Sequence, residues 1–179
     1  REQRETGKSS AVLLRVGTRG SQLARTQTGH VRDKLSNLGF DTQEIILTTR
    51  GDQQQTVPIA QIGNDGVFVR ELEKALLEDR IDLAVHSLKD LPTAMTPGLE
   101  FACVPPRATP FDVLVSREGT GLSNLPTGAR VGTASVRRRI QVQAIRPDVK
   151  VVPIRGNVDS RLKRLENDEL DAVILAAAG

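Results

Sequence analysis

Apolar and polar positions follow one another in blocks along this chain, and the blocks predict strands that lead into helices. Short apolar runs typical of strands occur at residues 12–16, 44–48, 81–85, 99–104, 112–116, 150–154 and 172–175. Apolar residues at helical spacing follow several of these runs, in segments that begin at Ser21, near Phe68, at Val136 and at Val158. Strands that alternate with helices favour the α/β class of fold.

A four-residue repeat divides the chain into two similar halves. Arg-Val-Gly-Thr occurs at residues 15–18 and again at residues 130–133, and each copy precedes a small-residue turn and a helix that carries arginines. We therefore predict two similar α/β lobes, each of which offers a helix N-terminus to one shared ligand. The stiff pair Pro105-Pro106 places the boundary between domains at residues 11–104 and 105–179, and residues 1–10, which contain no apolar side chain, are expected to form a disordered lead.

Composition limits the classes of protein to which the chain can belong. Hydrophobic residues make up 38% and charged residues 26%, which is ordinary for a soluble globular protein. No apolar run approaches the roughly 20 residues of a membrane helix, so we expect a cytoplasmic protein without a membrane partner. The single cysteine, Cys103, falls in the apolar run at 99–104, where a buried and unreactive thiol is expected.

Positive charge is concentrated near the end of the chain, although the net charge is only +3. This stretch is expected to face an anion. The chain has no Trp, no Tyr and four Phe, which leaves few side chains on which bases could stack, so small polyanions are favoured over nucleic acid. We expect no metal. The cations of the stretch are Arg137, Arg138, Arg139, Arg146, Arg155, Arg161, Lys163 and Arg164.

Polar chemistry is densest directly after the predicted strand at 81–85. His86, Ser87, Lys89 and Asp90 follow within five positions, and Pro92 stops any continuing strand. In open α/β sheets, ligands bind beyond the carboxyl ends of strands, so Lys89 and Asp90 become candidates for chemistry. A solvated turn with an incidental ion pair is the alternative interpretation.

A second candidate lies after the first strand. Gly17, Thr18, Arg19 and Gly20 are expected to form a loop that opens the helix at Ser21. A helix start exposes unpaired backbone N–H groups, and Arg19 adds a fork of donors. A carboxylate or phosphate group would fit there.

Together these segments resemble the porphobilinogen deaminase (hydroxymethylbilane synthase) family. The resemblance runs from about Leu13 to Gly179, and its most specific part is His-Ser-Leu-Lys-Asp-Leu-Pro at 86–92 with the paired arginines downstream. The matching segments are residues 15–24, 49–52, 68–73, 85–92, 131–138 and 154–158.

The resemblance implies a transferase of tetrapyrrole (heme) biosynthesis. Members of the family join four porphobilinogen molecules head to tail into hydroxymethylbilane and release ammonia at each addition. Growth starts from a dipyrromethane cofactor, which is covalently attached to a cysteine of a third, C-terminal domain, and the chain elongates between two lobes that resemble type II periplasmic-binding-protein domains. The third domain is missing here, and the last strand has no covering helix, so a truncation is expected. The complete protein is expected to be a monomer.

The resemblance also assigns roles to residues. Asp90 is the expected catalytic residue, because a carboxylate stabilises the azafulvene cation that forms when ammonia leaves. Arginine forks suit the acetate and propionate groups of the substrate. The residues expected to bind the cofactor are Ser87, Lys89, Thr133, Ser135, Arg137, Arg138 and Arg155, and those expected to bind substrate are Arg19, Ser21, Arg155 and Arg161.

Some positions depart from the family pattern or carry a simpler interpretation. Ala134 replaces a common serine, while Gln61 and Asp65 stand where many relatives carry lysines. Arg139, Arg146 and Arg164 are expected to lie on solvated helix faces. The alternative function is a non-catalytic, two-lobed binding module for small polycarboxylate anions. Asp90 distinguishes the two, because an anion disfavours carboxylate binding but stabilises a cation.

Overall fold

The computed structural model describes residues 12–48 and 69–179, which form two compact units. We call residues 12–48 and 69–100 lobe 1, and residues 101–179 lobe 2. The division falls between Glu100 and Phe101, whereas the sequence placed it before Pro105. The expected disordered lead, the segment 49–52, Gln61 and Asp65 lie outside the described residues.

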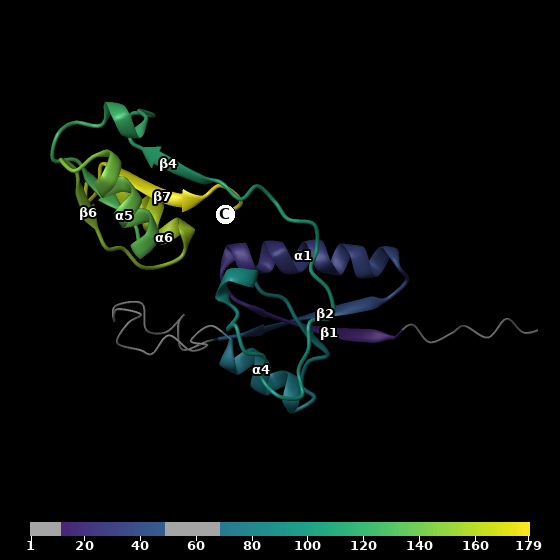
Figure 1. Cartoon of the computed structure of the whole chain (residues 1–179). Coiled ribbons are helices and arrows are strands. Elements are labelled where there is room, and N and C mark those ends of the chain that lie inside the picture. The colour runs from purple at the N-terminus through teal and green to yellow at the C-terminus, as the bar shows by residue number, and fades with distance from the viewer. Residues whose placement is uncertain (1–11, 49–68) are drawn as a thin grey trace, which may run out of the picture. The chain divides into compact units, whose positions relative to one another are not determined.

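Lobe 1 is a small parallel sheet with a helix on each face. The sheet order is β2-β1-β3, and both pairings are parallel. Figure 1 shows α1 and α4 on opposite sides of β1 and β2. In chain order the elements are β1 (Leu13–Arg19), α1 (Gln22–Asn37), β2 (Asp41–Leu47), α4 (Arg70–Leu77), β3 (Leu83–Ala84) and the 3-10 turn η1 (Leu88–Asp90).

Lobe 2 repeats this arrangement and adds one antiparallel strand, β4, at the edge of its sheet. The order is β4-β7-β5-β6, in which only the β4 pairing is antiparallel. Along β7, Ala172 and Ile174 pack in one core cluster with Val142 of α5, whereas Val173 and Leu175 pack in another with Leu165 of α6. Successive strand side chains point to opposite faces, so α5 and α6 cover opposite faces of this sheet. The elements are β4 (Asp112–Ser116), η2 (Leu122–Asn124), β5 (Arg130–Gly132), α5 (Val136–Ile145), β6 (Lys150–Val152), α6 (Val158–Glu166) and β7 (Ala172–Ala176).

Each lobe joins two neighbouring parallel strands, β1 and β3 in lobe 1 and β5 and β7 in lobe 2, with the same pair of residues, which we call the strand latch. In lobe 1, the Asp82 carboxylate accepts from the Arg15 backbone N–H (2.6 Å) and from its guanidinium (2.7 and 3.0 Å). In lobe 2, Asp171 accepts from Arg130 in the same three ways, at 2.7, 3.2 and 3.2 Å. Both latches join an arginine of one strand, β1 or β5, to the residue that directly precedes the neighbouring strand, β3 or β7.

The register of the strands repeats as well. Val16 pairs with Leu83 in lobe 1, and the equivalent Val131 pairs with Ala172 in lobe 2. The next residues, Gly17 and Gly132, face tightly packed side chains; a Cβ on Gly132 would lie 2.7 Å from Cδ1 of Leu170. The expectation of an α/β fold with two similar lobes is confirmed.

Three local predictions were wrong. Residues 99–104 form no strand and are mostly exposed, including Cys103, because no strand among the described residues offers backbone partners to this apolar run. Residues 17–19 belong to β1 rather than to a loop, since β2 pairs along the strand as far as Arg19. Strand β3 spans two residues instead of the five predicted at 81–85.

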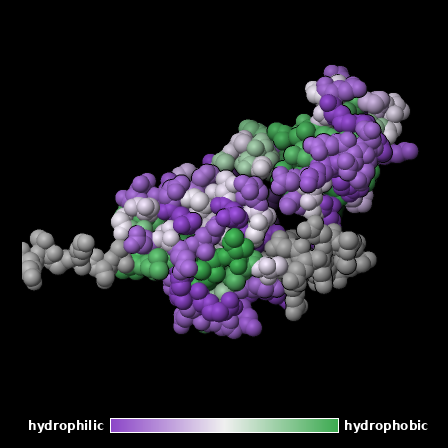
Figure 2. Space-filling view, turned by 180° about the vertical axis from the view of Figure 1, so that it is seen from behind, coloured by the Kyte–Doolittle hydropathy of each residue, from purple (hydrophilic) through white to green (hydrophobic). Residues whose placement is uncertain are grey.

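The surface combines hydrophilic residues with separate apolar patches. Figure 2 shows such patches on both lobes among hydrophilic side chains. On α5 the exposed apolar residues are Val136, Ile140 and Ile145. Within the described ranges, no helix combines the length and the apolar character needed to span a bilayer.

Candidate functional site

The candidate site of lobe 1 lies where β1 and β3 end. Because these strands are parallel, their carboxyl ends lie at the same edge of the sheet, and this places Arg19 near the turn η1. Nη1 of Arg19 lies 3.9 Å from Oδ2 of Asp90, which is an ion-pair distance and too long for a hydrogen bond. The structure thus brings together two predicted site residues that are 71 positions apart in the sequence.

The electrostatics of this site depend mainly on burial. Burial raises the pKa of Asp90 above its usual range, and the positive charges of Lys89 and Arg19 oppose the rise only in part. Burial also lowers the pKa of His86, with a further lowering by Arg19 and an opposing effect of Glu73. His86 is therefore neutral at pH 7, while the Asp90 carboxyl holds a proton more readily than an exposed aspartate does.

The run after β3 is held in place by hydrogen bonds to β1 and α1. The Val85 N–H donates to the Gly17 carbonyl (3.1 Å), and the Asp90 N–H donates to the Ser87 carbonyl (2.9 Å). The Ser87 hydroxyl donates to Oε1 of Gln27 on α1 (2.8 Å). Sequence reasoning missed Gln27; a polar residue one helical turn before the apolar Val31 is the signal that could have indicated it.

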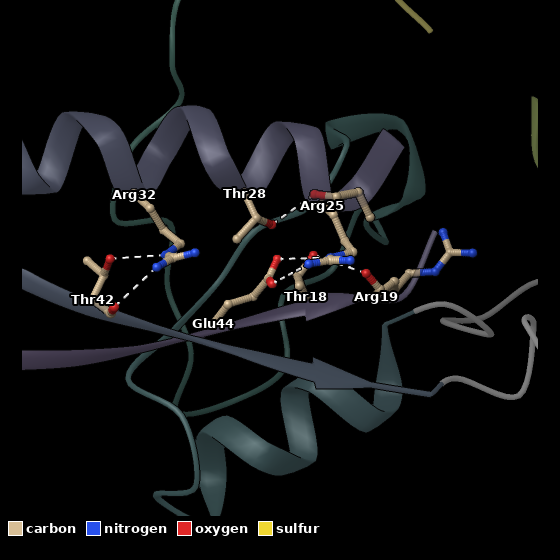
Figure 3. A network of polar contacts seen from close by, with 8 residues as sticks. Thr18, Arg19, Arg25, Thr28, Arg32, Thr42 and Glu44 are labelled. Atoms are coloured by element: carbon tan, nitrogen blue, oxygen red, sulfur yellow. Dashed lines mark hydrogen bonds and ion pairs between the residues drawn. The ribbon is translucent and has the colours of Figure 1, made fainter. Parts of the chain in front are cut away.

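A network between α1 and β2 fixes the start of the helix beside this site (Figure 3). Arg25 donates to Glu44 (3.0 Å), and Arg32 donates to the side chain of Thr42 (3.0 Å). The buried Thr28 donates to the Ala24 carbonyl (2.9 Å). The two arginine contacts join the helix to the sheet, while the Thr28 bond lies within the helix.

Three predicted hydroxyl residues build helix starts. Ser21 accepts from the Ala24 N–H (3.4 Å) and caps α1, and Ser135 accepts from the Arg138 N–H (3.3 Å) and caps α5. Thr133 accepts from the Ser135 N–H (3.2 Å). A hydroxyl that accepts from the backbone still carries its own hydrogen as a donor. Each of the three is therefore compatible with a role in binding an anion.

Lobe 2 brings three predicted arginines close to one another. Nε of Arg161 donates to the Gly156 carbonyl (2.9 Å), which directs the side chain along the start of α6. The pKa of Arg161 is lowered by burial first and then by the positive charges of Arg138 and Arg155. Cations that disfavour one another's charge are stabilised by an anion, so this cluster is suited to bind carboxylates.

Arg138 already has an internal carboxylate partner. Its Nε and Nη2 donate to the two Asp112 oxygens at 2.9 and 2.5 Å, and Nη1 donates to the Ile174 carbonyl (3.4 Å). The side chain therefore connects α5 with β4 and β7. Sequence reasoning missed Asp112, and nothing in the spacing of the two residues indicated that they meet.

The remaining predicted residues lie in more open positions. Lys89 and Arg137 are exposed, as are Arg139 and Ala134. The prediction of a solvated Arg146 was wrong, because its guanidinium donates to the carbonyls of residues 122, 123 and 125 and to Asp148 and is only 15% exposed. These contacts hold the turn η2 in place.

Comparison with known proteins gives this geometry its context. Residues 14–179 match the family model described as "Porphobilinogen deaminase, dipyromethane cofactor binding domain". A porphobilinogen deaminase of Syntrophotalea carbinolica is 45% identical over 95% of this chain and 55% of its own length. One of Corynebacterium efficiens is 51% identical over 94% of this chain and 55% of its own length. The chain thus spans about half the length of these curated relatives.

Among solved structures, an ancestral arginine-binding protein bound to glutamine covers 93% of this chain and 70% of its own, at 17% identity and a TM-score of 0.42. The family model, in contrast, matches the sequence itself from residue 14 to residue 179. The chain therefore belongs to the porphobilinogen deaminase family.

Proposed function

We propose that this chain is part of an enzyme that joins four porphobilinogen molecules head to tail into hydroxymethylbilane and releases ammonia at each addition. The observation that carries the proposal is the partly buried Asp90, which faces Arg19 at 3.9 Å in the run that best matches the family. Such an enzyme would act in tetrapyrrole biosynthesis, in the cytoplasm and as a monomer, on a small-molecule substrate without nucleic acid or membrane partners.

Asp90 is suited to the step in which ammonia leaves the substrate. Loss of ammonia leaves positive charge on the pyrrole unit, and a fixed carboxylate in a site of reduced polarity stabilises that charge. Burial raises the pKa of Asp90, which makes its carboxyl a better proton carrier than an exposed aspartate. Arg19, with Lys89 nearby, keeps the site attractive for the acetate and propionate groups of the same substrate.

The residues of lobe 2 fit the carboxylates of a dipyrromethane cofactor. When bound, this group supplies the pyrrole to which the first substrate is added. Arg155 and Arg161 would bind its acetate and propionate groups, while Ser135 and Thr133 have hydroxyl hydrogens suited to the same oxygens. Arg138 would do so while its guanidinium is also held by Asp112.

The cofactor cysteine of the family belongs to a C-terminal domain, and we expect no attachment to Cys103. Our sequence interpretation rested on burial of that thiol, which the exposed position of Cys103 removes. The expectation now rests on the resemblance alone.

A non-catalytic module for small polycarboxylate anions is the second candidate. The arginine cluster favours it, because three cations near one another bind carboxylates without any chemistry. Asp90 counts against it, since a carboxylate beside the site repels an anionic ligand and offers a pure binding protein no advantage.

The experiment is a turnover assay of the complete protein with porphobilinogen. We expect Asp90→Asn to lower the rate by about 10²- to 10⁴-fold while leaving the unfolding temperature nearly unchanged and ligand binding no weaker than in the wild type. Asp33→Asn, which makes the same change at an exposed position of α1, is the matched control and should retain the wild-type rate. Near-normal turnover in Asp90→Asn would contradict the catalytic assignment, and ligand binding without any turnover in the wild type would favour the binding module.

A further inference from the structure

The hydrogen bond between Ser87 and Gln27 fixes the direction in which the Ser87 hydroxyl can act. Ser87 Oγ donates to Oε1 of Gln27 at 2.8 Å, across 60 positions of sequence. A serine hydroxyl has one hydrogen and two lone pairs, and an amide oxygen can only accept. With its hydrogen given to Gln27, Ser87 can act toward a ligand only as an acceptor.

This polarity conflicts with the role that the sequence suggested for Ser87. Acetate and propionate groups are themselves acceptors, so a hydroxyl that offers only lone pairs repels them. Groups that complement an acceptor are N–H donors. Under the proposed function, on which this inference rests, the substrate carries such a donor in its pyrrole ring.

We propose that Ser87, held by Gln27, accepts a hydrogen bond from a pyrrole N–H of the ligand, and that Gln27 acts as a positioning residue. The position of Asp90 agrees with this assignment. Ser87 and Asp90 lie at the two ends of one turn, in which the Asp90 N–H donates to the Ser87 carbonyl (2.9 Å). The turn thus presents a hydroxyl lone pair and a carboxyl group, which both suit the electropositive side of a pyrrole ring. The arginines suit its acid groups.

The test uses two ligands that differ only in the ring donor. The first is a pyrrole that carries one acetate and one propionate but no aminomethyl group, and the second is its furan counterpart, in which oxygen replaces N–H. Binding of both to the complete protein is measured by calorimetry. We expect the wild type to prefer the pyrrole by about tenfold, because the furan oxygen faces the lone pair of Ser87.

Variants test the contribution of each residue and the direction of the hydrogen bond between Ser87 and Gln27. Ser87→Ala should bring the pyrrole-to-furan ratio close to one, and Gln27→Met, which lacks an acceptor, should lower it as well. Gln27→Glu keeps acceptor oxygens at the same place and should preserve the ratio. The matched control is Gln43→Met on the exposed side of β2, which should bind both probes as the wild type does. Unfolding temperatures confirm that each variant is folded.

Each remaining outcome has a definite meaning. If Ser87→Ala weakens both probes equally and the ratio stays constant, Ser87 donates to a carboxylate and our inference is wrong. If Gln27→Glu no longer prefers the pyrrole over the furan, the Gln27 amide donates to Ser87 in the wild type. That outcome also overturns the inference. If the wild type binds neither probe, the proposed function fails and this inference falls with it.

Discussion

Lobe 1 and lobe 2 share one frame but carry different chemistry. Both contain the strand latch and the same register between the two strands that it joins. In both, an aspartate with a left-handed backbone conformation follows the helix before the latch: Asp79 (φ 52°) in lobe 1 and Asp168 (φ 59°) in lobe 2. At the other end of the strands the lobes diverge. Lobe 1 places a carboxyl group against one arginine, whereas lobe 2 gathers three arginines.

One difference lies between β1 or β5 and the helix that follows it. Three positions separate Thr18 from the capping Ser21, but only two separate Thr133 from the capping Ser135. Lobe 1 thus has one more residue in this segment, where Arg19 is the last residue of β1. The comparison indicates that the latches stabilise the same fold in both lobes. The residues at the carboxyl ends of the strands differ between the lobes and can therefore carry different chemistry.

The largest effect that tests this division should come from the arginines of lobe 2. In the complete protein, Arg155→Leu should weaken binding of a linear polypyrrole by about 10- to 100-fold, because each lost charged hydrogen bond contributes roughly 1.5–3 kcal/mol. The bound substrate should still react at a near-normal rate. Arg139→Leu, at an exposed position on α5, is the matched control. Titrations at rising salt should also show the wild-type affinity falling.

Variants of two further predicted arginines of lobe 2 complete this test. Arg137→Leu and Arg138→Leu should also weaken binding, and Arg138→Leu should in addition destabilise lobe 2, because its two hydrogen bonds to Asp112 are lost. Unchanged affinity in all three variants would mean that the arginines form only a charged surface.

Gly17 and Gly132 test whether the two lobes depend on the same packing beside their paired strands. An alanine at Gly132 would place its Cβ 2.7 Å from Leu170 and 3.0 Å from Ile154, and one at Gly17 would collide with Ile81 and Leu72. Overpacking of this kind costs about 1–3 kcal/mol of unfolding free energy. Urea unfolding should show a similar loss for Gly17→Ala and Gly132→Ala. Gly29→Ala on α1, where a Cβ meets nothing within 4 Å, should instead be neutral or stabilising.

The latches predict a common response to acid. Hydrogen bonds from Arg15 and Arg130 lower the pKa values of Asp82 and Asp171 to about 2 in the folded protein. An unfolded aspartate has a pKa of about 3.9, so this stabilisation is complete above about pH 5 and is lost as the pH falls toward 2. Asp82→Asn and Asp171→Asn should therefore each lower stability at pH 7, by about 1 kcal/mol for such partly exposed groups.

Acid unfolding monitored by circular dichroism measures this response. The difference between each latch variant and the wild type should shrink between pH 5 and pH 2. A difference that stays constant over this range would show that the latch carboxylates are not the cause.

The smallest effect concerns Cys103. Its exposed thiol should react fully with iodoacetamide in the native protein, and the modification should leave the unfolding temperature unchanged. Protection of Cys103 until the protein is unfolded would restore the original interpretation of a buried thiol. Mass spectrometry after incubation with porphobilinogen tests the separate expectation that no pyrrole becomes attached to Cys103.

The sequence was most informative where a pattern is local. Strand β4 was predicted with its observed bounds, and the starts of α5 and α6 followed from the turns that precede them and from the residues at helical spacing. The apolar run at 99–104 was misread because periodicity does not show whether a neighbouring strand will supply backbone partners.

Contacts between distant segments were beyond the sequence. Ser87 and Gln27 lie 60 positions apart, and Arg138 and Asp112 lie 26 apart, with no spacing rule that joins either pair. The latch is an exception. Once residues 15–18 are aligned with 130–133, an aspartate before each neighbouring strand could have been noticed at positions 82 and 171.

The placement of the latches, away from the polar ends of the strands, bears on how inherited or engineered substitutions would act in cells. A change at Arg15 or Asp171 lowers the amount of folded protein, because it raises the population open to proteases. Under the proposed function, a change at Asp90 should leave that amount intact and lower the turnover of each molecule. The ratio of enzyme activity to immunodetected protein in a cell extract should therefore stay normal for latch substitutions and fall for substitutions at Asp90.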